Sequence, residues 1–252
     1  MTSIKKQSEI KLMAEGGKIL ARIMRELKDR VMPGVATREL DRLAENLVLN
    51  SQAKCSFKGY DDYPACLCVS LNDVIVHGVP SDDIILKDGD IVSLDLGILF
   101  KGYHTDMAIT VPVGKVSPEA NRLIHVAKKS LKRAIKKVRP GNTFGDIGNT
   151  IQRYVESQGF NVIRSLCGHA IGRKLHEDPQ ILNYGKRHTG SEIKEEMTFC
   201  LEPMVVAGDW KIIKSEDGFG YKTKDGSLSA HFEHTILVTS NGCKVLTPLE
   251  ES

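Results

Sequence analysis

Five side chains able to bind metal stand out in this sequence: four carboxylates and one imidazole. All five lie in short apolar runs typical of β-strands or strand ends. Burying a carboxylate is costly unless a cation compensates its charge. No Lys or Arg lies inside these runs, so bound metal is the simpler compensation. The residues, with their runs, are Asp95 (91–97), Asp106 (105–111), His169 (167–172), Glu202 (199–206) and Glu233 (231–238).

The donor types indicate which ions and which chemistry to expect. Oxygen-rich sites suit hard or borderline divalent ions, and one imidazole favours Mn, Fe, Co or Zn over Ca or Mg. In two-metal hydrolases the ions lie about 3.5–4 Å apart and activate a shared water. Other catalytic templates are missing from the sequence: residues 176–179 read HEDP instead of HExxH, and neither GxSxG nor GxxxxGK[ST] occurs.

The elements that must position these side chains alternate between helical and strand-like patterns. Pro33-Gly34 is expected to end the first helix, and Thr37 to cap the second. This is α+β organisation, with no disordered linker to divide the chain. Helices are predicted over 8–30, 37–50, 117–138 and 143–158, and strands dominate the stretches from 51 to 113 and from 161 to 247.

An internal repeat links the two parts of the chain. Residues 31–48 align without gaps on 138–155, a shift of 107 residues from Val31 to Val138. The same shift carries Asp95 onto Glu202, and with a 20-residue insertion Asp106 meets Glu233. The sequence therefore predicts one domain over 1–252 with related halves of roughly 31–111 and 138–238. Each half would give two carboxylates to a central site, an arrangement suited to two metal ions.

Composition sets broad limits on the class of protein. The chain has 252 residues, 41% hydrophobic and 27% charged, as in an ordinary soluble globular protein. The net charge of +3 does not by itself argue for nucleic acid. The N-terminus lacks the apolar core of a secretory signal, and no run is long enough to cross a membrane. We therefore expect a cytoplasmic protein with no membrane partner.

The six cysteines show neither a CxxC pair nor the spacing of a disulfide framework. With no secretory signal, they are predicted to be reduced thiols in a cytosolic protein. Cys167, two residues before His169, is interpreted as structural rather than as a nucleophile, because nothing in its neighbourhood marks it as activated.

Five ordered motifs together resemble type I methionine aminopeptidases, members of the pita-bread metallopeptidase family, over nearly the whole chain. The resemblance implies a pita-bread fold: two pseudo-symmetric halves whose curved central antiparallel sheet is covered by helices. Only 26 residues separate His176 from Glu202, too few for the insertion of type II enzymes, and no N-terminal zinc-binding extension is expected. The motifs are SLNDVIVHGVP (70–80), DLGILFKGYHTD (95–106), CGHAIGRKLHEDP (167–179), LEPMV (201–205) and SLSAHFEHTILVT (227–239).

By this resemblance the five metal-binding side chains form a dinuclear site. Asp95 would lie mostly on one ion and His169 on the other, and Asp106 and Glu233 would bridge them. Glu202 would ligate and also pass protons to and from the bridging water. Hydroxide activated by the two ions would then attack the scissile carbonyl. The implied reaction removes the initiator methionine from nascent proteins and peptides, mainly when the second residue is small.

Four further histidines belong to this prediction. The resemblance implies that His77 contacts the substrate on the side of the scissile amide nitrogen, and that His176 steadies the carbonyl oxygen as it becomes an oxyanion. His104 and His231 each lie two residues before a predicted ligand on a strand. Side chains two apart on a strand share a face, so both are expected either to support the metal ligands or to serve in packing.

An apolar pocket for the methionine side chain is also implied. This chain departs from the better-known bacterial pattern at three positions: Phe57 replaces a cysteine, Leu175 an aromatic residue and Phe219 a tryptophan. The pocket stays apolar, so we expect the preference for methionine to survive. The pocket residues are Tyr60, Tyr63, Cys68, Leu175 and Phe219, with Phe57 at the edge, and a monovalent cation is expected near Asn72, Val74 and Ser229.

A strongly basic run, Lys128–Lys137, occupies the third predicted helix. Six basic side chains are expected on one side and apolar ones on the other: Ala127, Leu131, Ala134 and Val138. The basic side is either a solvated helix face or a contact with ribosomal RNA near the peptide exit.

Two alternatives to the aminopeptidase remain at this stage. One is a proline-specific pita-bread peptidase, of the prolidase or aminopeptidase P type; these normally carry a large N-terminal domain. The other is a non-catalytic pita-bread binding protein, a class that has lost metal ligands, whereas all five ligand positions are filled here. No obvious oligomerisation segment is present, so a monomer is expected.

Overall fold

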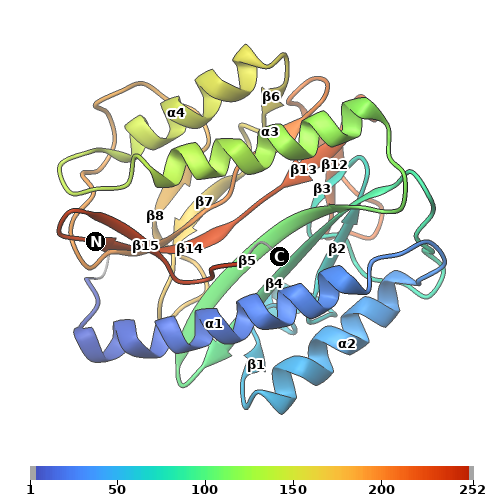
Figure 1. The fold of residues 1–252 in the computed structure, drawn as a ribbon, viewed down its shortest axis with the longest axis horizontal. Coiled ribbons are helices and arrows are strands. Elements are labelled where there is room, and N and C mark those ends of the chain that lie inside the picture. Colours follow the sequence, from blue (N-terminus) through green and yellow to red (C-terminus); the bar gives the residue numbers. More distant parts are fainter. Residues whose placement is uncertain (1–3, 250–252) are drawn as a thin grey trace.

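A computed structural model of the chain describes residues 4–249. Residues 1–3 and 250–252 lie outside the described part, so it does not include the two ends of the predicted 1–252 domain or the first residues of the N-terminus discussed above. The helices α1–α4 lie against a curved set of strands, with α1 and α2 along one side and α3 and α4 along the other (Figure 1). Within the described residues, no helix has both the length and the apolarity needed to cross a bilayer.

The four helices are close to their predicted ranges: α1 (Gln7–Asp29), α2 (Thr37–Asn50), α3 (Pro118–Ile135) and α4 (Phe144–Ser157). The Ser117 hydroxyl accepts a hydrogen bond from the Ala120 N–H (3.1 Å), which caps α3. Thr143 and Asp146 cap α4 reciprocally.

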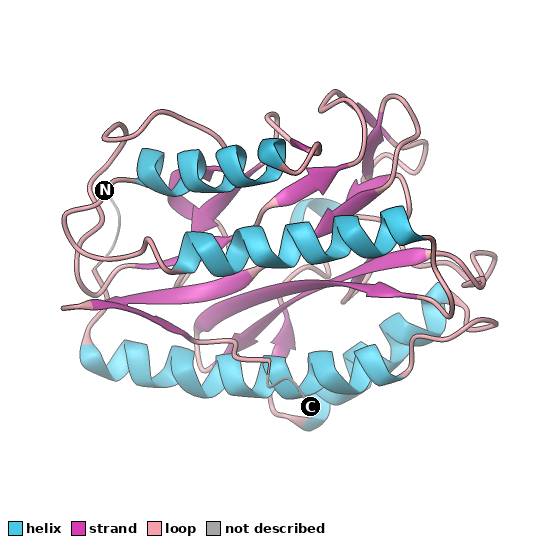
Figure 2. Cartoon of the chain, turned by 45° about the horizontal axis from the view of Figure 1, so that its top comes forward, coloured by secondary structure: helices cyan, strands magenta, loops and turns pink. Residues whose placement is uncertain are grey.

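Every strand pair in the described structure is antiparallel, and the strands form two larger and two smaller sheets (Figure 2). The first sheet contains β1 (Lys54–Cys55), β2 (Cys68–Leu71), β4 (Ile91–Phe100) and β5 (Tyr103–Pro112). The second contains β7 (Cys167–Ala170), β8 (Glu177–Leu182), β9 (Thr198–Leu201), β14 (His234–Thr239) and β15 (Gly242–Val245). The smaller sheets are β6 (Asn161–Val162) with β10 (Met204–Val206) and β13 (Ser229–His231), and β3 (Val74–Val76) with β11 (Ile212–Lys214) and β12 (Tyr221–Thr223).

The two larger sheets meet along β5, at a boundary we call the seam. The backbones of Ala108 and Glu233 exchange hydrogen bonds there, with N···O distances of 2.9 and 3.4 Å. The Thr235 hydroxyl accepts from the Asp106 N–H and donates to the Asp106 carbonyl, both at 2.8 Å. Backbone and hydroxyl bonds therefore fix one half against the other.

The predicted repeat reappears in the backbone hydrogen bonds, with the same 107-residue shift. The Gly34 N–H donates to the Leu86 carbonyl, and the Gly141 N–H donates to the Ile193 carbonyl. The bridge between residues 36 and 85 likewise recurs between residues 143 and 192. Both glycines have positive φ, +93° and +86°, which glycine adopts without the steric cost of a Cβ. The fold thus has two pseudo-symmetric halves.

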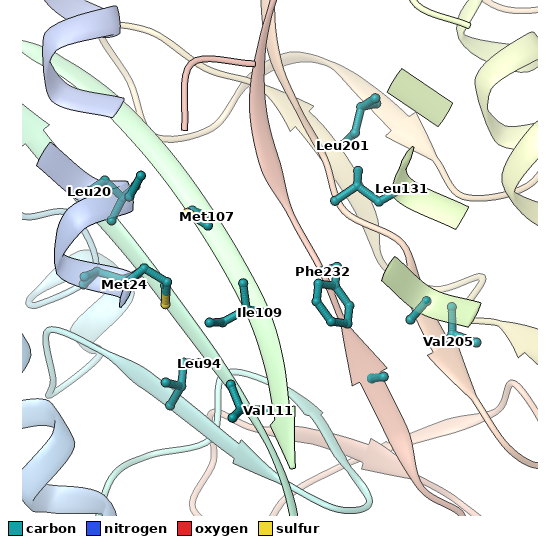
Figure 3. Close-up of a cluster of buried hydrophobic side chains, with 14 of the residues drawn as sticks. Leu20, Met24, Leu94, Met107, Ile109, Val111, Leu131, Leu201, Val205 and Phe232 are labelled. Atoms are coloured by element: carbon teal, nitrogen blue, oxygen red, sulfur yellow. The ribbon is translucent and has the colours of Figure 1, made fainter. Parts of the chain in front are cut away.

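Strand alternation separates the core from the polar face of the sheet. Met107 and Ile109 on β5 point toward Leu20 and Met24 of α1 (Figure 3), and all four side chains are buried. Fully burying such a side chain contributes about 1.5–3 kcal/mol. Because successive strand residues face opposite sides, Asp106 lies on the face away from the helices.

Two sequence predictions are wrong. Cys55 and Cys66 form a disulfide, so reduced thiols remain only at Cys68, Cys167, Cys200 and Cys243. The loop between β1 and β2 returns Cys66 to within 5.1 Å (Cα–Cα) of Cys55, a closure that spacing alone does not reveal. Thr37 does not cap α2: Ala36 occupies the cap position and Glu39 accepts its N–H, while the Thr37 hydroxyl bonds Ser81.

Candidate active site

The five predicted metal ligands converge at the seam and line one cavity of about 710 Å³. Asp95 lies on β4 and Asp106 on β5, where Asp106 pairs with Gly97. His169 lies on β7, Glu202 directly follows β9, and Glu233 lies between β13 and β14. Residues from both halves therefore reach the same space.

The donor atoms are close enough to share ions. One oxygen from each of Asp95, Asp106 and Glu233 lies within 4.8 Å of the others. His169 Nε2 lies 3.5 Å from Glu202 Oε1 and 4.0 Å from Glu233 Oε1. On the other side of the ring, Nδ1 lies 3.1 Å from the Ala170 carbonyl. An N–H at Nδ1 donates to that carbonyl, which leaves the Nε2 lone pair facing the carboxylates.

Burial makes this cluster unfavourable as free carboxylates. It raises the pKa of Asp106 to about 7, and it raises those of Asp95, Glu202 and Glu233 well above their usual range, with neighbouring negative charges adding to the effect. Burial also lowers the pKa of His169 to about 3, so its imidazole is neutral.

The unsatisfied atoms of the cluster fit divalent cations. Asp95 Oδ1, Glu202 Oε1 and Glu233 Oε1 are buried without a hydrogen-bond partner. In residues 4–249, no Lys or Arg forms an ion pair with any of the four carboxylates. Carboxylate oxygens with one neutral imidazole suit Mn, Fe, Co or Zn.

Two thiols lie near this cluster, Cys200 and Cys167. Cys200 Sγ lies within 4.8 Å of the donor atoms of His169 and Glu233. Burial raises the pKa of Cys200 well above its usual value, and it also raises that of Cys167. In the metal-free protein neither thiol is therefore activated as a nucleophile, whereas an ion bound beside Cys200 would itself favour the thiolate.

The two histidines predicted to contact substrate line the same cavity. Burial lowers the pKa of His77 to about 4 and also lowers that of His176. His77 has φ +58°, a conformation rare outside glycine and often found at functional sites. His176 Nδ1 lies 2.9 Å from the Tyr60 hydroxyl, and its ring meets His169 edge-on at 4.4 Å between centroids.

His104 and His231 differ in their surroundings. His231 lines the cavity, with Nε2 3.7 Å from Glu202 Oε2. His104 does not line it; its Nδ1 lies 2.8 Å from the Ser56 hydroxyl. Of the two roles that were predicted, His231 therefore supports the ligand cluster and His104 serves in packing.

All six residues predicted at the methionine pocket line the cavity. Tyr63 and Phe219 meet edge-on at 5.6 Å, and the Tyr63 hydroxyl donates to the Gly78 carbonyl (2.8 Å). Leu175 is 2% exposed, whereas Tyr60 is 41% exposed and lies at the mouth. Sequence reasoning missed three apolar lining residues, although each lies within or beside a motif: Val76, Leu166 and Met204.

The predicted monovalent-cation residues also meet, outside the cavity lining. The Ser229 hydroxyl oxygen lies 2.9 Å from the Asn72 carbonyl and 3.0 Å from the Val74 carbonyl, and its one proton is shared between them. Three oxygens thus converge where β13 approaches β3.

Two helix-covered halves with candidate metal ligands at their junction are the pita-bread arrangement, and the chain belongs to metallopeptidase family M24, whose model matches residues 11–240. Within this family it is similar to the methionine aminopeptidase of Escherichia coli K12, with 44% identity covering 97% of this chain and 93% of the relative. A crystal structure of methionine aminopeptidase from Thermotoga maritima matches with a TM-score of 0.97 and 44% identity, covering 98% of this chain and 99% of that one. Prolidase from Pyrococcus horikoshii shares the fold, with a TM-score of 0.76 at 23% identity; the match covers 99% of this chain and 64% of the prolidase.

Proposed function

We propose that this protein is a metal-dependent methionine aminopeptidase, a hydrolase that removes the initiator methionine from nascent proteins and peptides, mainly when the second residue is small. The observation that carries the proposal is the single cavity that joins the carboxylate cluster to an apolar wall. The similarity to curated methionine aminopeptidases over nearly the full length supports it.

Asp95, Asp106, His169, Glu202 and Glu233 would hold two divalent ions, with Mn, Fe, Co and Zn as the candidates. Bound there, the ions would supply Lewis acidity and lower the pKa of water. Glu202 would ligate an ion and could also accept a proton from the activated water and pass it toward the leaving amine.

The two neutral histidines would orient the scissile amide. His176, held by the Tyr60 hydroxyl through Nδ1, can donate from Nε2 to the carbonyl oxygen as negative charge develops. His77 would contact the nitrogen side of the same bond. Preorganised donors of this kind lower the barrier because they need no reorientation during the reaction.

The apolar wall would receive the methionine side chain. Tyr63, Cys68 and Phe219 form one part of it and Leu175 another, with Phe57 between them. An unbranched thioether fits irregular apolar spaces well. Tyr60 would cover the mouth.

Several finer points belong to the same proposal. Residues 1–252 would act as one catalytic domain and as a monomer, which size-exclusion chromatography with light scattering tests. The working compartment would be the cytoplasm, where nascent chains present their N-termini. The oxygens of Asn72, Val74 and Ser229 would bind a monovalent cation with a structural role.

We also propose that the basic residues of α3 contribute to a contact with ribosomal RNA. The predicted apolar side of the helix is buried, whereas the basic side chains flank both edges. At one edge, the charges of Lys128 and Lys132 add to the lowering of the pKa of His234 that burial causes. At the other, the guanidinium carbon of Arg133 lies 4.3 Å from the centroid of the Tyr154 ring. Arg133 borders a cavity of about 570 Å³ lined by further cations: Lys137, Arg139, Arg153 and Arg187. If the contact exists, Arg133→Glu with Arg153→Glu weakens salt-sensitive co-sedimentation with ribosomes.

Peptide cleavage tests the central proposal. Metal-stripped protein is re-supplied with Mn, Fe, Co or Zn and given Met-Ala-Ser, Leu-Ala-Ser or Ala-Pro-Ala, with Glu202→Gln as the matched isosteric control. Release of Met alone, restored by metal and lost in the variant, is the expected result. Release from Ala-Pro-Ala would instead indicate a proline-specific peptidase, and metal binding without cleavage would indicate a binding protein.

A further inference from the structure

The loop between β7 and β8 carries four residues that line the cavity: Arg173, Lys174, Leu175 and His176. Its backbone leaves the β7–β8 ladder after Ala170 and rejoins it at Glu177. In between, the Gly172 carbonyl accepts from the His104 N–H (2.7 Å) and the Gly172 N–H donates to the Lys174 carbonyl (3.1 Å). With few backbone bonds of its own, the loop depends on side chains to hold its far end.

An ion pair between a buried lysine and a half-buried glutamate supplies that hold. Lys5 is only 3% exposed, and its Nζ donates to Glu177 Oε2 at 2.9 Å. The other oxygen, Glu177 Oε1, accepts from the Lys174 N–H at 3.2 Å. One carboxylate therefore joins the N-terminal segment to the loop backbone, immediately beside His176.

The backbone of Lys5 is itself held in place by hydrogen bonds. The Lys5 N–H donates to the Glu196 carbonyl (3.0 Å), and residue 4 bridges residue 197, just before β9. Gly172 leaves the space that the pair needs: a Cβ there would overlap Lys5 Cε and lie 2.6 Å from Nζ. The ion pair is thus built into the packing between the N-terminal segment and the loop.

A second, more exposed connection runs in parallel. Glu9, near the start of α1, accepts from Arg173 (2.9 Å) and from the Tyr103 hydroxyl (2.7 Å). Arg173 is 70% exposed, so solvent screens this ion pair. The less exposed Lys5–Glu177 pair is therefore the stronger of the two tethers.

We propose that Lys5 is a positioning residue: through Glu177 it fixes the 172–177 loop and thereby the place of His176 beside the substrate carbonyl. The inference rests on the proposed aminopeptidase function. It assigns a catalytic consequence to a residue far from the reacting atoms in sequence and outside the cavity lining.

The test compares Lys5→Met, Lys5→Arg and Glu177→Gln with Lys11→Met, a control on the exposed side of α1, all loaded with the same divalent ion. For Met-Ala-Ser we expect kcat to fall about 10- to 100-fold in Lys5→Met and Glu177→Gln, since small misplacements of catalytic groups cost this much. KM should change little, Lys5→Arg should retain most of the activity, and Lys11→Met should match the wild type.

Imidazole NMR signals provide a readout independent of activity. The His176 signals, assigned with His176→Asn, should move in Lys5→Met and Glu177→Gln but not in Lys11→Met, while those of His234 stay in place. Unmoved His176 signals with wild-type kcat in either folded variant would overturn the inference, as would Lys5→Arg behaving like Lys5→Met. If the wild type cleaves no Met peptide, the proposed function fails, whereas the NMR comparison still decides whether Lys5 positions His176.

Discussion

Removing metal should make this protein unusually sensitive to rising pH. In the metal-free protein burial raises the pKa of Asp106 from 3.8 to about 7. A pKa raised by folding means that the native state binds more protons than the unfolded chain. The contribution of Asp106 to the free energy of unfolding is therefore fully present below about pH 4 and is lost as pH rises through about 7.

The size of the effect follows from the same pKa. Moving it from 3.8 to about 7 corresponds to about 4 kcal/mol of free energy of unfolding for this one group. Between pH 5 and pH 7 the loss is about 2 kcal/mol. The raised pKa values of Asp95, Glu202 and Glu233 act in the same direction. A divalent ion at about 1,000 times its Kd returns about 4 kcal/mol, enough to offset Asp106.

Urea unfolding in EDTA and in saturating Mn, from pH 5 to pH 8.5, measures this directly. Wild-type protein in EDTA should lose stability as pH rises, and Mn should flatten the curve. Asp106→Asn in EDTA should be more stable than the wild type at pH 8 by up to about 4 kcal/mol, with a smaller gain from Mn. A metal-free wild type that gains stability from pH 5 to pH 7 would refute the reasoning, as would an Asp106→Asn variant that is less stable than the wild type in EDTA at pH 8.

Three other substitutions test the hydrogen bond to His176, the disulfide and the edge of the methionine pocket. Tyr60→Phe removes the hydroxyl 2.9 Å from His176 Nδ1 and should lower kcat about fivefold, worth about 1 kcal/mol, with KM little changed; equal kcat would contradict the positioning role of Tyr60. Cys55→Ser opens the disulfide and should lower the free energy of unfolding by about 2–4 kcal/mol, with no further loss on adding reductant, which thermal melts with and without reductant would show. Gly97→Ala places a Cβ 2.8 Å from the ring of Phe57, so it should raise KM for Met peptides and cost about 1–3 kcal/mol of stability; an unchanged KM would mean that the ring moves freely.

Much of the fold could be read from the sequence because local signals and long-range signals agreed. The Pro-Gly pairs at 33–34 and 140–141 each end in a glycine with positive φ, and each precedes a helix. Their 107-residue spacing gave the register of the two halves before any contact was known. That the four carboxylates gather at one site could also be predicted, since carboxylates inside apolar strands are rare enough to require an explanation.

What the sequence did not reveal depends on contacts between distant segments. Closing Cys55 onto Cys66 requires the path of the loop between β1 and β2, which no periodicity encodes. Likewise, period-2 alternation put His104 and His231 on the same faces as predicted ligands. His104 meets Ser56 because the segment after β1 is held against β4, where the Ser56 N–H donates to the Gly97 carbonyl. The Lys5–Glu177 pair spans 172 positions and carries no local signal at all.

The symmetry of the halves is broken at the site itself. Each half supplies two carboxylates, but the imidazoles of His169 and His231 both come from the C-terminal half. The bonds between Thr235 and Asp106 and between Thr110 and the His231 backbone tie these contributions together across the seam. Neither half alone holds the whole set of predicted ligands, because the N-terminal half gives the carboxylates of Asp95 and Asp106, whereas the C-terminal half gives two carboxylates and the imidazole of His169. The two sides of the cluster are therefore chemically different, although the strands that build them are related by the repeat.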